Sequence, residues 1–358
     1  FLAICSASLP EPSIGPNSST QADDYFNTVL YTGNGSTSHG ITGVGFQPDW
    51  VWIKNRPDVV DHVITDAVRG ATKRLESNSA DTEVTQTEDL QSFDADGFTV
   101  GNQNRVNGSS DAMVAWNWKA GGTAVSNTDG SITSSVSADQ DAGFSIVSYT
   151  GTGANATIGH GLSSAPETIL IKARTRAENW LAYNKFDGGT DGRSFLNLNT
   201  TGAKFDNGPN SYFQDTPPTA SVFYQNGSSY NQNTDTYIAY CFHSVEGYSK
   251  VASYTGNGNA DGMFVYTGFR PAWVLLKDTG AASDWQMYDS KRYAFNKLNA
   301  TEVVEANTTT AETTTVNELD FLSNGFKLRS SNTFSNKSGS TFIYLAFAED
   351  PFKYANAR

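Results

Sequence analysis

One segment of the sequence occurs three times, and this repetition restricts the possible fold more than any other feature. Each copy begins with a Tyr-Thr-Gly motif. A proline follows 17 residues later, a lysine 6 residues after the proline, a ring 8 residues after the lysine, and Asp or Asn 4 residues after the ring. Four matching intervals predict that one structural unit is used three times. The landmarks are Tyr31, Pro48, Lys54, His62 and Asp66 in copy one, Tyr149, Pro166, Lys172, Trp180 and Asn184 in copy two, and Tyr254, Pro271, Lys277, Trp285 and Asp289 in copy three.

Within each copy the residue pattern is that of short β-strands. The runs WVWI at 50–53 and WVLL at 273–276 are apolar and lie between a proline and a charged residue, as in strands buried on both faces. Glycine and asparagine after each landmark tyrosine favour tight turns. No stretch keeps a helical period. We therefore predict an all-β fold of three tandem β-sandwich domains, of the jelly-roll or concanavalin-like type.

The predicted boundaries lie in polar stretches. We assign residues 1–22 to an N-terminal arm, 23–122 to the first domain, 123–140 to a linker, 141–246 to the second domain and 247–358 to the third. The Thr-rich segment 301–315 is predicted to be a long exposed loop. The chain begins without Met, and we expect further residues upstream of Phe1.

Charge and composition exclude several classes of partner. The net charge is −13, and no basic stripe is present that could displace counterions from nucleic acid or bind an anionic membrane surface. No apolar run reaches the roughly 20 residues that cross a bilayer. Charged residues make up 17% of the chain, so the surface must be rich in neutral polar groups. The two cysteines, Cys5 and Cys241, are expected to be free thiols.

Catalytic patterns are not visible in this chain. No stretch matches a nucleotide-binding, serine-hydrolase or zinc-protease motif. Asp94 and Asp96 flank a predicted turn, where carboxylates commonly cap the backbone, and Asn324 replaces Asp96 in copy three. His62 aligns with tryptophans, which favours a packing role over a general base. We therefore expect no enzyme, no catalytic residue, no metal site and no cofactor.

The landmark ring followed by Asp or Asn is the best candidate for ligand binding. Trp180 with Asn184, and Trp285 with Asp289, could each present a ring beside a hydrogen-bonding group, as sugar-binding sites do. The alternative is that a tryptophan at a repeated position packs in the core.

Arginine follows the landmark aspartate three residues later in copies one and three. These residues are Arg69 and Arg292. We expect ion pairs with Asp66 and Asp289 that fix a turn.

The repeated segments resemble a repeat-domain family of structural proteins from marine tailed bacteriophages. The resemblance covers nearly the whole chain after the arm. It rests on YTGNG at 31–35, GFQPDWVWIK at 45–54, DAVRGATKRL at 66–75, VAWNWKAGG at 114–122, YCFHSVEGYSK at 240–250, GFRPAWVLLK at 268–277 and AFAEDPFKY at 346–354.

The resemblance implies a lectin-like sandwich located in the virion, as a tail fibre, tail spike or capsid-surface component. It implies other virion proteins as partners and assembly into a homotrimer. The leading hypothesis is adhesion to a host-surface glycan, with neither nucleic acid nor membrane as a partner. Two alternatives stay open: a polysaccharide depolymerase, and a purely architectural decoration protein.

Overall fold

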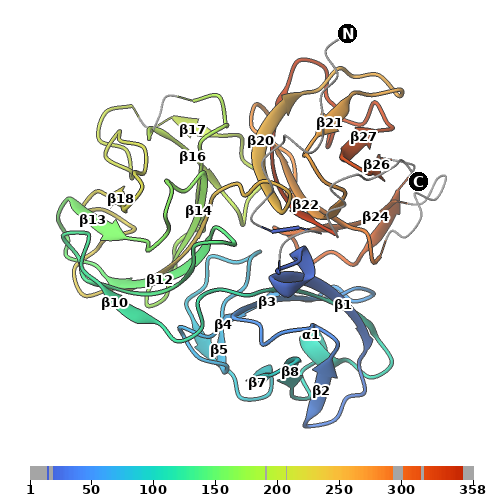
Figure 1. Ribbon diagram of the computed structural model, residues 1–358, viewed down its shortest axis with the longest axis horizontal. Coiled ribbons are helices and arrows are strands. Elements are labelled where there is room, and N and C mark those ends of the chain that lie inside the picture. Colours follow the sequence, from blue (N-terminus) through green and yellow to red (C-terminus); the bar gives the residue numbers. More distant parts are fainter. Residues whose placement is uncertain are drawn as a thin grey trace.

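The computed structural model describes residues 14–15, 19–189, 192–206, 208–292, 301–315 and 318–349. Their strands pair into antiparallel sheets and helix is rare among them, so the predicted all-β class is confirmed. Figure 1 shows three lobes around a common centre, one for each sequence copy. Most of the predicted N-terminal arm lies outside the described residues. Its residue Ile14 is described, and it is buried.

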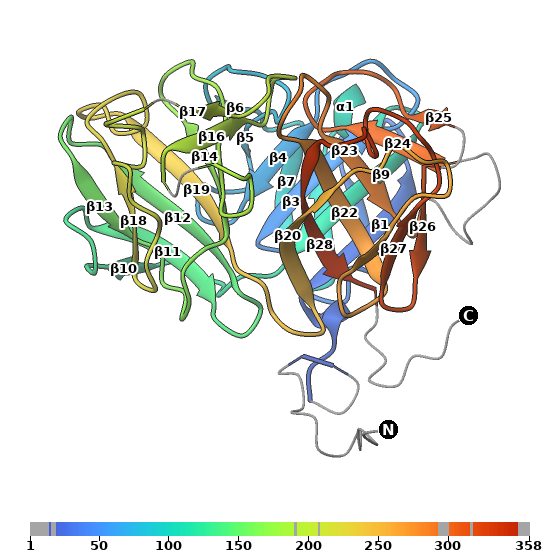
Figure 2. The ribbon, with the colours of Figure 1, turned by 90° about the horizontal axis from the view of Figure 1, so that it is seen from above.

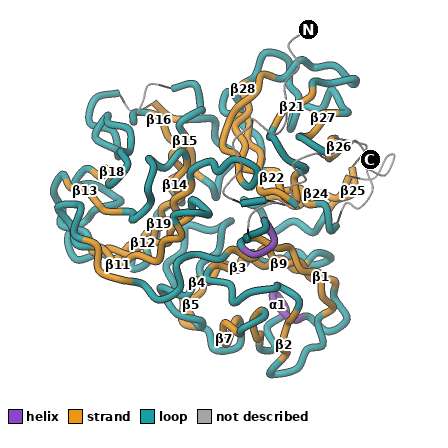
Figure 3. The backbone as a smooth tube through the Cα atoms, in the orientation of Figure 1, coloured by secondary structure: helices purple, strands orange, loops and turns teal. Residues whose placement is uncertain are grey.

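Copy one contains a main sheet and a smaller second sheet. The hydrophobic cluster between them takes Val51 and Ile53 from the main sheet and Ile41 and Phe98 from the second. Figure 3 shows the two helical segments of the described chain, η2 (Ala22–Asp24) and α1 (Asn104–Asn107), both in this copy. The main sheet has the order β1 (Phe26–Thr32), β9 (Ala112–Trp118), β3 (Trp50–Asn55), β4 (Val63–Asp66), and the second has the order β2 (His39–Thr42), β8 (Gly97–Val100), β7 (Leu90–Asp94), with a separate pair β5 (Lys73–Arg74) and β6 (Val84–Thr85).

Copies two and three repeat this arrangement with longer main sheets. The second copy has the order β10 (Val125–Asn127), β11 (Ser134–Asp139), β12 (Phe144–Thr150), β19 (Thr236–Phe242), β14 (Thr168–Ala173), β15 (Leu181–Asn184), β16 (Ser194–Asn197), β17 (Phe205–Asp206), beside a pair β13 (Ala156–Gly159) and β18 (Val222–Gln225). The third has β20 (Ser249–Thr255), β28 (Thr341–Ala348), β22 (Pro271–Asp278), β23 (Gln286–Asp289), β24 (Thr301–Glu305), β25 (Thr313–Thr315), beside β21 (Phe264–Tyr266), β27 (Gly325–Leu328), β26 (Leu319–Leu322).

The landmark residues occupy the same register in all three main sheets. The landmark lysine lies opposite a branched residue of the last strand in each copy: Lys54 opposite Val114, Lys172 opposite Ile238, and Lys277 opposite Ile343. The equal intervals of the sequence thus correspond to equal positions in the strand pairing. Figure 2 shows the strands of the main sheets running from one end of the molecule toward the other.

The Tyr-Thr-Gly motif has a specific packing role beyond turn formation. The landmark tyrosine donates its hydroxyl proton to a carbonyl of the loop before the last strand, as Tyr31 does to Val106 O at 2.6 Å. A Cβ at Gly33 would lie 2.0 Å from Gly108 O, so only glycine allows this approach. Gly35 has a φ of +66°, which again favours glycine. Tyr149 and Tyr254 make the corresponding bonds in the other copies.

Two segments differ from the sequence-based prediction. The segment 123–140, predicted as a linker, contains β10 and β11, because Val136 faces the core and β11 pairs with β12. The segment 301–315, predicted as an exposed loop, contains the paired strands β24 and β25 and buries Val303 and Val304. In both segments a few apolar side chains among many Ser and Thr residues are enough to anchor a strand.

An aromatic cluster fills the centre where the three copies meet. Its rings touch across each pair of copies: Trp50 and Tyr240 at 4.6 Å between centroids, Trp118 and Trp273 at 5.4 Å, and Phe242 and Phe347 at 6.0 Å. Each main sheet therefore buries one face in its own copy and the other in the shared centre. This explains why strand β3 is buried along its whole length.

Candidate functional site

The three copies contact one another through three seams with one shared pattern of hydrogen bonds. We name them the 1–2, 2–3 and 3–1 seams after the copies that meet there. At each seam the landmark ring of one copy contacts a backbone carbonyl of its neighbour. The atom pairs are Trp180 Nε1 and Glu76 O at 2.8 Å (1–2), Trp285 Nε1 and Asn197 O at 3.0 Å (2–3), and His62 Nε2 and Glu305 O at 3.1 Å (3–1).

The landmark lysines form a second bond at each seam. Lys172 Nζ lies 2.9 Å from Ala80 O at the 1–2 seam, Lys277 Nζ 3.4 Å from Thr201 O at the 2–3 seam, and Lys54 Nζ 3.0 Å from Thr309 O at the 3–1 seam. All three side chains are buried, and burial lowers the pKa of each lysine to about 8. The lysines therefore have a structural role between copies.

The landmark acids also face a neighbouring copy. Asp66 accepts a hydrogen bond from Tyr240 Oη at 2.7 Å across the 1–2 seam, and Asp289 accepts one from Trp116 Nε1 at 3.1 Å across the 3–1 seam. Each also pairs with the arginine three residues later, so the two predicted ion pairs are confirmed.

The four residues predicted as a ligand platform lie in the interior. Trp180, Asn184, Trp285 and Asp289 are each at most 5% exposed. Asn184 and Trp285 come together at a small void in the 2–3 seam, beside Leu345. Trp180 lies at the 1–2 seam and Asp289 at the 3–1 seam, so the predicted pairs are not kept together as two binding units. Their placement corresponds to the packing alternative that the sequence left open.

Two other aromatic rings are exposed side by side on copy three. Phe264 and Tyr266 are 40% and 64% exposed, while Val265 between them is 5% exposed and faces the core. This alternation follows from the two-residue period of strand β21. On the neighbouring strand β27, Lys327 lies opposite Phe264 and Gly325 lies opposite Tyr266. We call the outer surface formed by Phe264, Tyr266, Gly325 and Lys327 the aromatic face.

Glycine and charge shape the aromatic face. A Cβ at Gly325 would lie 2.9 Å from the Phe264 ring, so the glycine lets this ring lie against the sheet. Lys327 Nζ forms an ion pair with Asp261 at 2.9 Å and donates to Gly262 O at 2.8 Å. The hydrogen bond from Lys327 lowers the pKa of the exposed Asp261 carboxyl, which stays ionised at neutral pH. Asp261 thus supplies an ionised acceptor that is held by a lysine of the aromatic face.

The aromatic face is specific to copy three. The register of β2 with β8 places Gly40 and Thr42 at the corresponding positions of copy one. In copy two the corresponding strand β13 carries Thr157 and Gly159, and Ser131 N donates to Thr157 Oγ1 at 2.8 Å. Sequence reasoning missed Phe264 and Tyr266 because it looked for residues repeated in all copies. The signal available was the alternation Phe-Val-Tyr in a short predicted strand.

The described residues contain no group of three or more His, Cys, Asp or Glu side chains arranged to hold a metal ion. No helix among them is long and apolar enough to cross a membrane. Cys241 is a buried free thiol, as predicted, and burial raises its pKa, whereas Cys5 lies outside the described residues.

The chain was also compared with known proteins. One family model matches residues 21–351, and its description is a domain of unknown function, DUF7483. No curated protein and no solved structure matches the chain. The matched region covers copies one and two and extends to residue 351 of copy three.

Proposed function

The chain belongs to the DUF7483 family, and because that description assigns no activity, we propose a function from the chain's own geometry. We propose a non-enzymatic structural protein of a bacteriophage virion, in a tail fibre, spike or capsid surface, that adheres to a host-surface glycan through the aromatic face. In this proposal the three copies are tandem lectin-like sandwich domains, and the chain assembles with other virion proteins as a homotrimer.

The observation that carries the adhesion proposal is the exposed pair Phe264 and Tyr266. Large apolar side chains grouped on a surface mark binding sites more often than scattered ones do. A ring accepts the apolar face of a sugar, and the Asp261 carboxylate, which pairs with Lys327 of the same face, can accept hydrogen bonds from hydroxyl groups. The two exposed rings do not contribute to the core of copy three, because Val265 is the residue of this strand that faces the core.

The charge of the chain supports a carbohydrate partner over the other classes. A net charge of −13 repels nucleic acid and anionic membrane surfaces. The aromatic face lies on paired strands of copy three, and copy three packs against both other copies. Sites on strands are positioned more accurately than sites on loops.

The test is retention of the purified chain on host cells and on host surface glycan, with release of shorter oligosaccharide measured in the same samples. We expect retention without release, and the double variant F264A/Y266A should lose at least tenfold in retention because both stacking surfaces are gone. The matched control is Phe205→Ala, which removes a ring of 44% exposure from copy two. Equal retention of the double variant and the control would refute the proposal, and oligosaccharide release would establish a depolymerase instead.

A further inference from the structure

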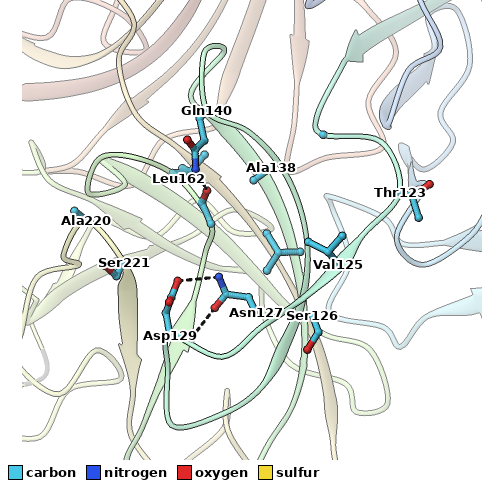
Figure 4. A pocket seen from close by; sticks show the side chains of 13 residues that line it. Thr123, Val125, Ser126, Asn127, Asp129, Ala138, Gln140, Leu162, Ala220 and Ser221 are labelled. Carbon is cyan, nitrogen blue, oxygen red and sulfur yellow. Dashed lines mark hydrogen bonds between the residues drawn. The ribbon is translucent and has the colours of Figure 1, made fainter.

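A groove of about 380 Å³ opens on copy two, next to the hairpin of β10 and β11. Figure 4 shows Gln140 and Leu162 toward one end of it and Asn127 and Asp129 toward the other. The hairpin belongs to the segment 123–140, and its strand β11 pairs with β12. In copies one and three the corresponding strands, β1 and β20, are edge strands of their main sheets. The groove is therefore a feature of copy two that the threefold repetition does not predict.

Hydrogen bonds and close contacts hold the polar side chains of the groove in place. Asn127 Nδ2 donates to Asp129 Oδ2 at 2.9 Å, and Asn127 Oδ1 accepts from Asp129 N at 3.0 Å. A Cβ at Gly159 would lie 1.7 Å from Asn127 Oδ1, so this side chain is seated against the glycine backbone. At the other end, Gln140 Nε2 donates to Gly161 O at 3.0 Å. The site is thus organised before any ligand arrives.

The chemistry of the lining selects for a neutral polyhydroxylated ligand. No lysine or arginine lines the groove, which disfavours an anion, and a single carboxylate is too little for a cation. Amide and hydroxyl groups can both donate to and accept from sugar hydroxyls, and the carboxylate of Asp129 can accept from them. Val125, Val136 and Leu162 form an apolar wall for the C–H face of a ring. A volume of about 380 Å³ is near the lower end of small-molecule sites, and suits one or two sugar rings.

We propose that this groove is a second carbohydrate site, which takes a single uncharged sugar residue. It goes beyond adhesion through the aromatic face, because it lies in another copy, uses no aromatic ring and takes its ligand in an open groove. Asp129 is the main acceptor for ligand hydroxyls, Gln140 orients the other end of the ring, and the hairpin supplies the apolar wall.

The test is saturation-transfer NMR of the full chain with glucose, galactose, mannose and N-acetylglucosamine at millimolar concentration. At least one of them should bind the unaltered chain, whereas glucuronate should not, because Asp129 repels its carboxylate. Asp129→Ala and Gln140→Ala should each weaken binding on the order of tenfold, since each removes a hydrogen bond to the ligand. Ser135→Ala, an exposed residue of β11 that does not line the groove, is the matched control and should bind normally.

The outcomes separate this site from the aromatic face. The F264A/Y266A variant should bind the monosaccharide normally even where it loses retention on cells. No binding of any of the four sugars to the unaltered chain would overturn the groove proposal and leave the adhesion test unaffected. Loss of the signal in F264A/Y266A but not in Asp129→Ala would also overturn it, because the sugar would then be bound at the aromatic face.

Discussion

Among the described residues, ion pairs cross the 1–2 and 3–1 seams and none crosses the 2–3 seam, although all three seams share the same bonds to backbone carbonyls. At the 1–2 seam Glu83 bridges Arg69 of its own copy, at 3.2 Å, and Arg174 of the next copy, at 2.8 Å. At the 3–1 seam Glu312 bridges Arg292, at 2.8 Å, and Arg56, at 2.6 Å. The two seams thus carry the same network in different copies.

At the 2–3 seam the same positions hold different residues. The backbone bond from Lys204 N to Thr279 O, 2.9 Å, corresponds to that from Glu83 N to Arg174 O, also 2.9 Å. Lys204 therefore replaces the bridging glutamate, and Thr279 replaces the arginine of the neighbouring copy. Asn184 replaces the landmark aspartate. The seam keeps the ring and lysine contacts and loses the ion pairs.

The comparison distinguishes the contacts that define the geometry of a seam from those that add to its stability. The ring and lysine bonds to backbone carbonyls occur at all three seams, so they define the geometry. The ionic networks lie at the 1–2 and 3–1 seams. Copies three and one are not consecutive in the chain. Consecutive copies are joined by connections of equal length, residues 119–124 between β9 and β10 and residues 243–248 between β19 and β20, so the length of the connection does not explain why the 2–3 seam differs.

The largest expected effect is at the landmark acid. Asp289→Ala should lower the free energy of unfolding by about 4 kcal/mol, because it removes the carboxylate that pairs with the buried Arg292 and accepts from Trp116, and leaves Arg292 with Glu312 as its remaining charged partner. Asn184→Ala, the matched change at the 2–3 seam, should cost about 1 kcal/mol. Urea unfolding measures both. Equal costs would break the distinction between seams, and Asp289→Asn provides a milder variant in case the alanine variant does not fold.

Alkaline pH should reveal a contribution that is the same at all seams. Burial lowers the pKa of Lys54, Lys172 and Lys277 to about 8, below the ordinary lysine value of 10.5. Between these values the unfolded chain binds more protons, so stability should rise from pH 8 to 9, by roughly 1 kcal/mol for each lysine. Unfolding at several pH values measures this slope.

Single Lys→Met variants provide the control for the alkaline effect. Each should remove a similar share of the slope, whichever seam it belongs to, because all three lysines are buried and bonded to carbonyls. A slope that depends on one lysine alone would show that the seams do not share this contact.

Glu312→Gln should cost about 2 kcal/mol at neutral pH, since Arg292 and Arg56 both lose a charged partner. Burial alone would raise the pKa of Glu312, but the two arginines outweigh it and lower the pKa below 4.5. The stabilisation is therefore complete above the unfolded pKa and disappears as pH falls through the lower folded value. The free energy of unfolding should therefore fall less steeply with decreasing pH in the variant than in the unaltered chain. The same pH dependence in both would contradict this assignment.

Much of the fold could be predicted from the sequence because each landmark has the same backbone environment in every copy. The sequence intervals that include Tyr31 and Lys54 are the same in each copy. A change of interval would shift these residues out of register with their partners on the neighbouring strand. The ion pair of Asp66 with Arg69 was predictable because it is local. These features depend on residues that are near one another in the chain or fixed by strand pairing.

The candidate site was less predictable. A sequence pattern can indicate that a residue is buried, but it does not show which part of the molecule or which ligand covers that residue. Trp180 and Trp285 look alike whether a sugar or a neighbouring copy covers the ring, and the closure of the three copies is not encoded in any spacing. Phe264 and Tyr266 have no counterparts, so the search for repeated residues passed over them. The strands in 123–140 depend on a few apolar contacts, such as that of Val136, within a polar segment.

The smallest change in stability is expected at Lys204, which occupies the position of the bridging glutamate in the 2–3 seam. Lys204 takes the place of Glu83 and Glu312, but within the described part of the chain its Nζ donates only to Asp187 O, at 3.1 Å. Lys204→Ala should therefore change the free energy of unfolding by less than about 1 kcal/mol. A loss as large as that of Glu312→Gln would show that the 2–3 seam relies on charge after all. The result decides whether the ring and lysine contacts hold the 2–3 seam together without an ionic network.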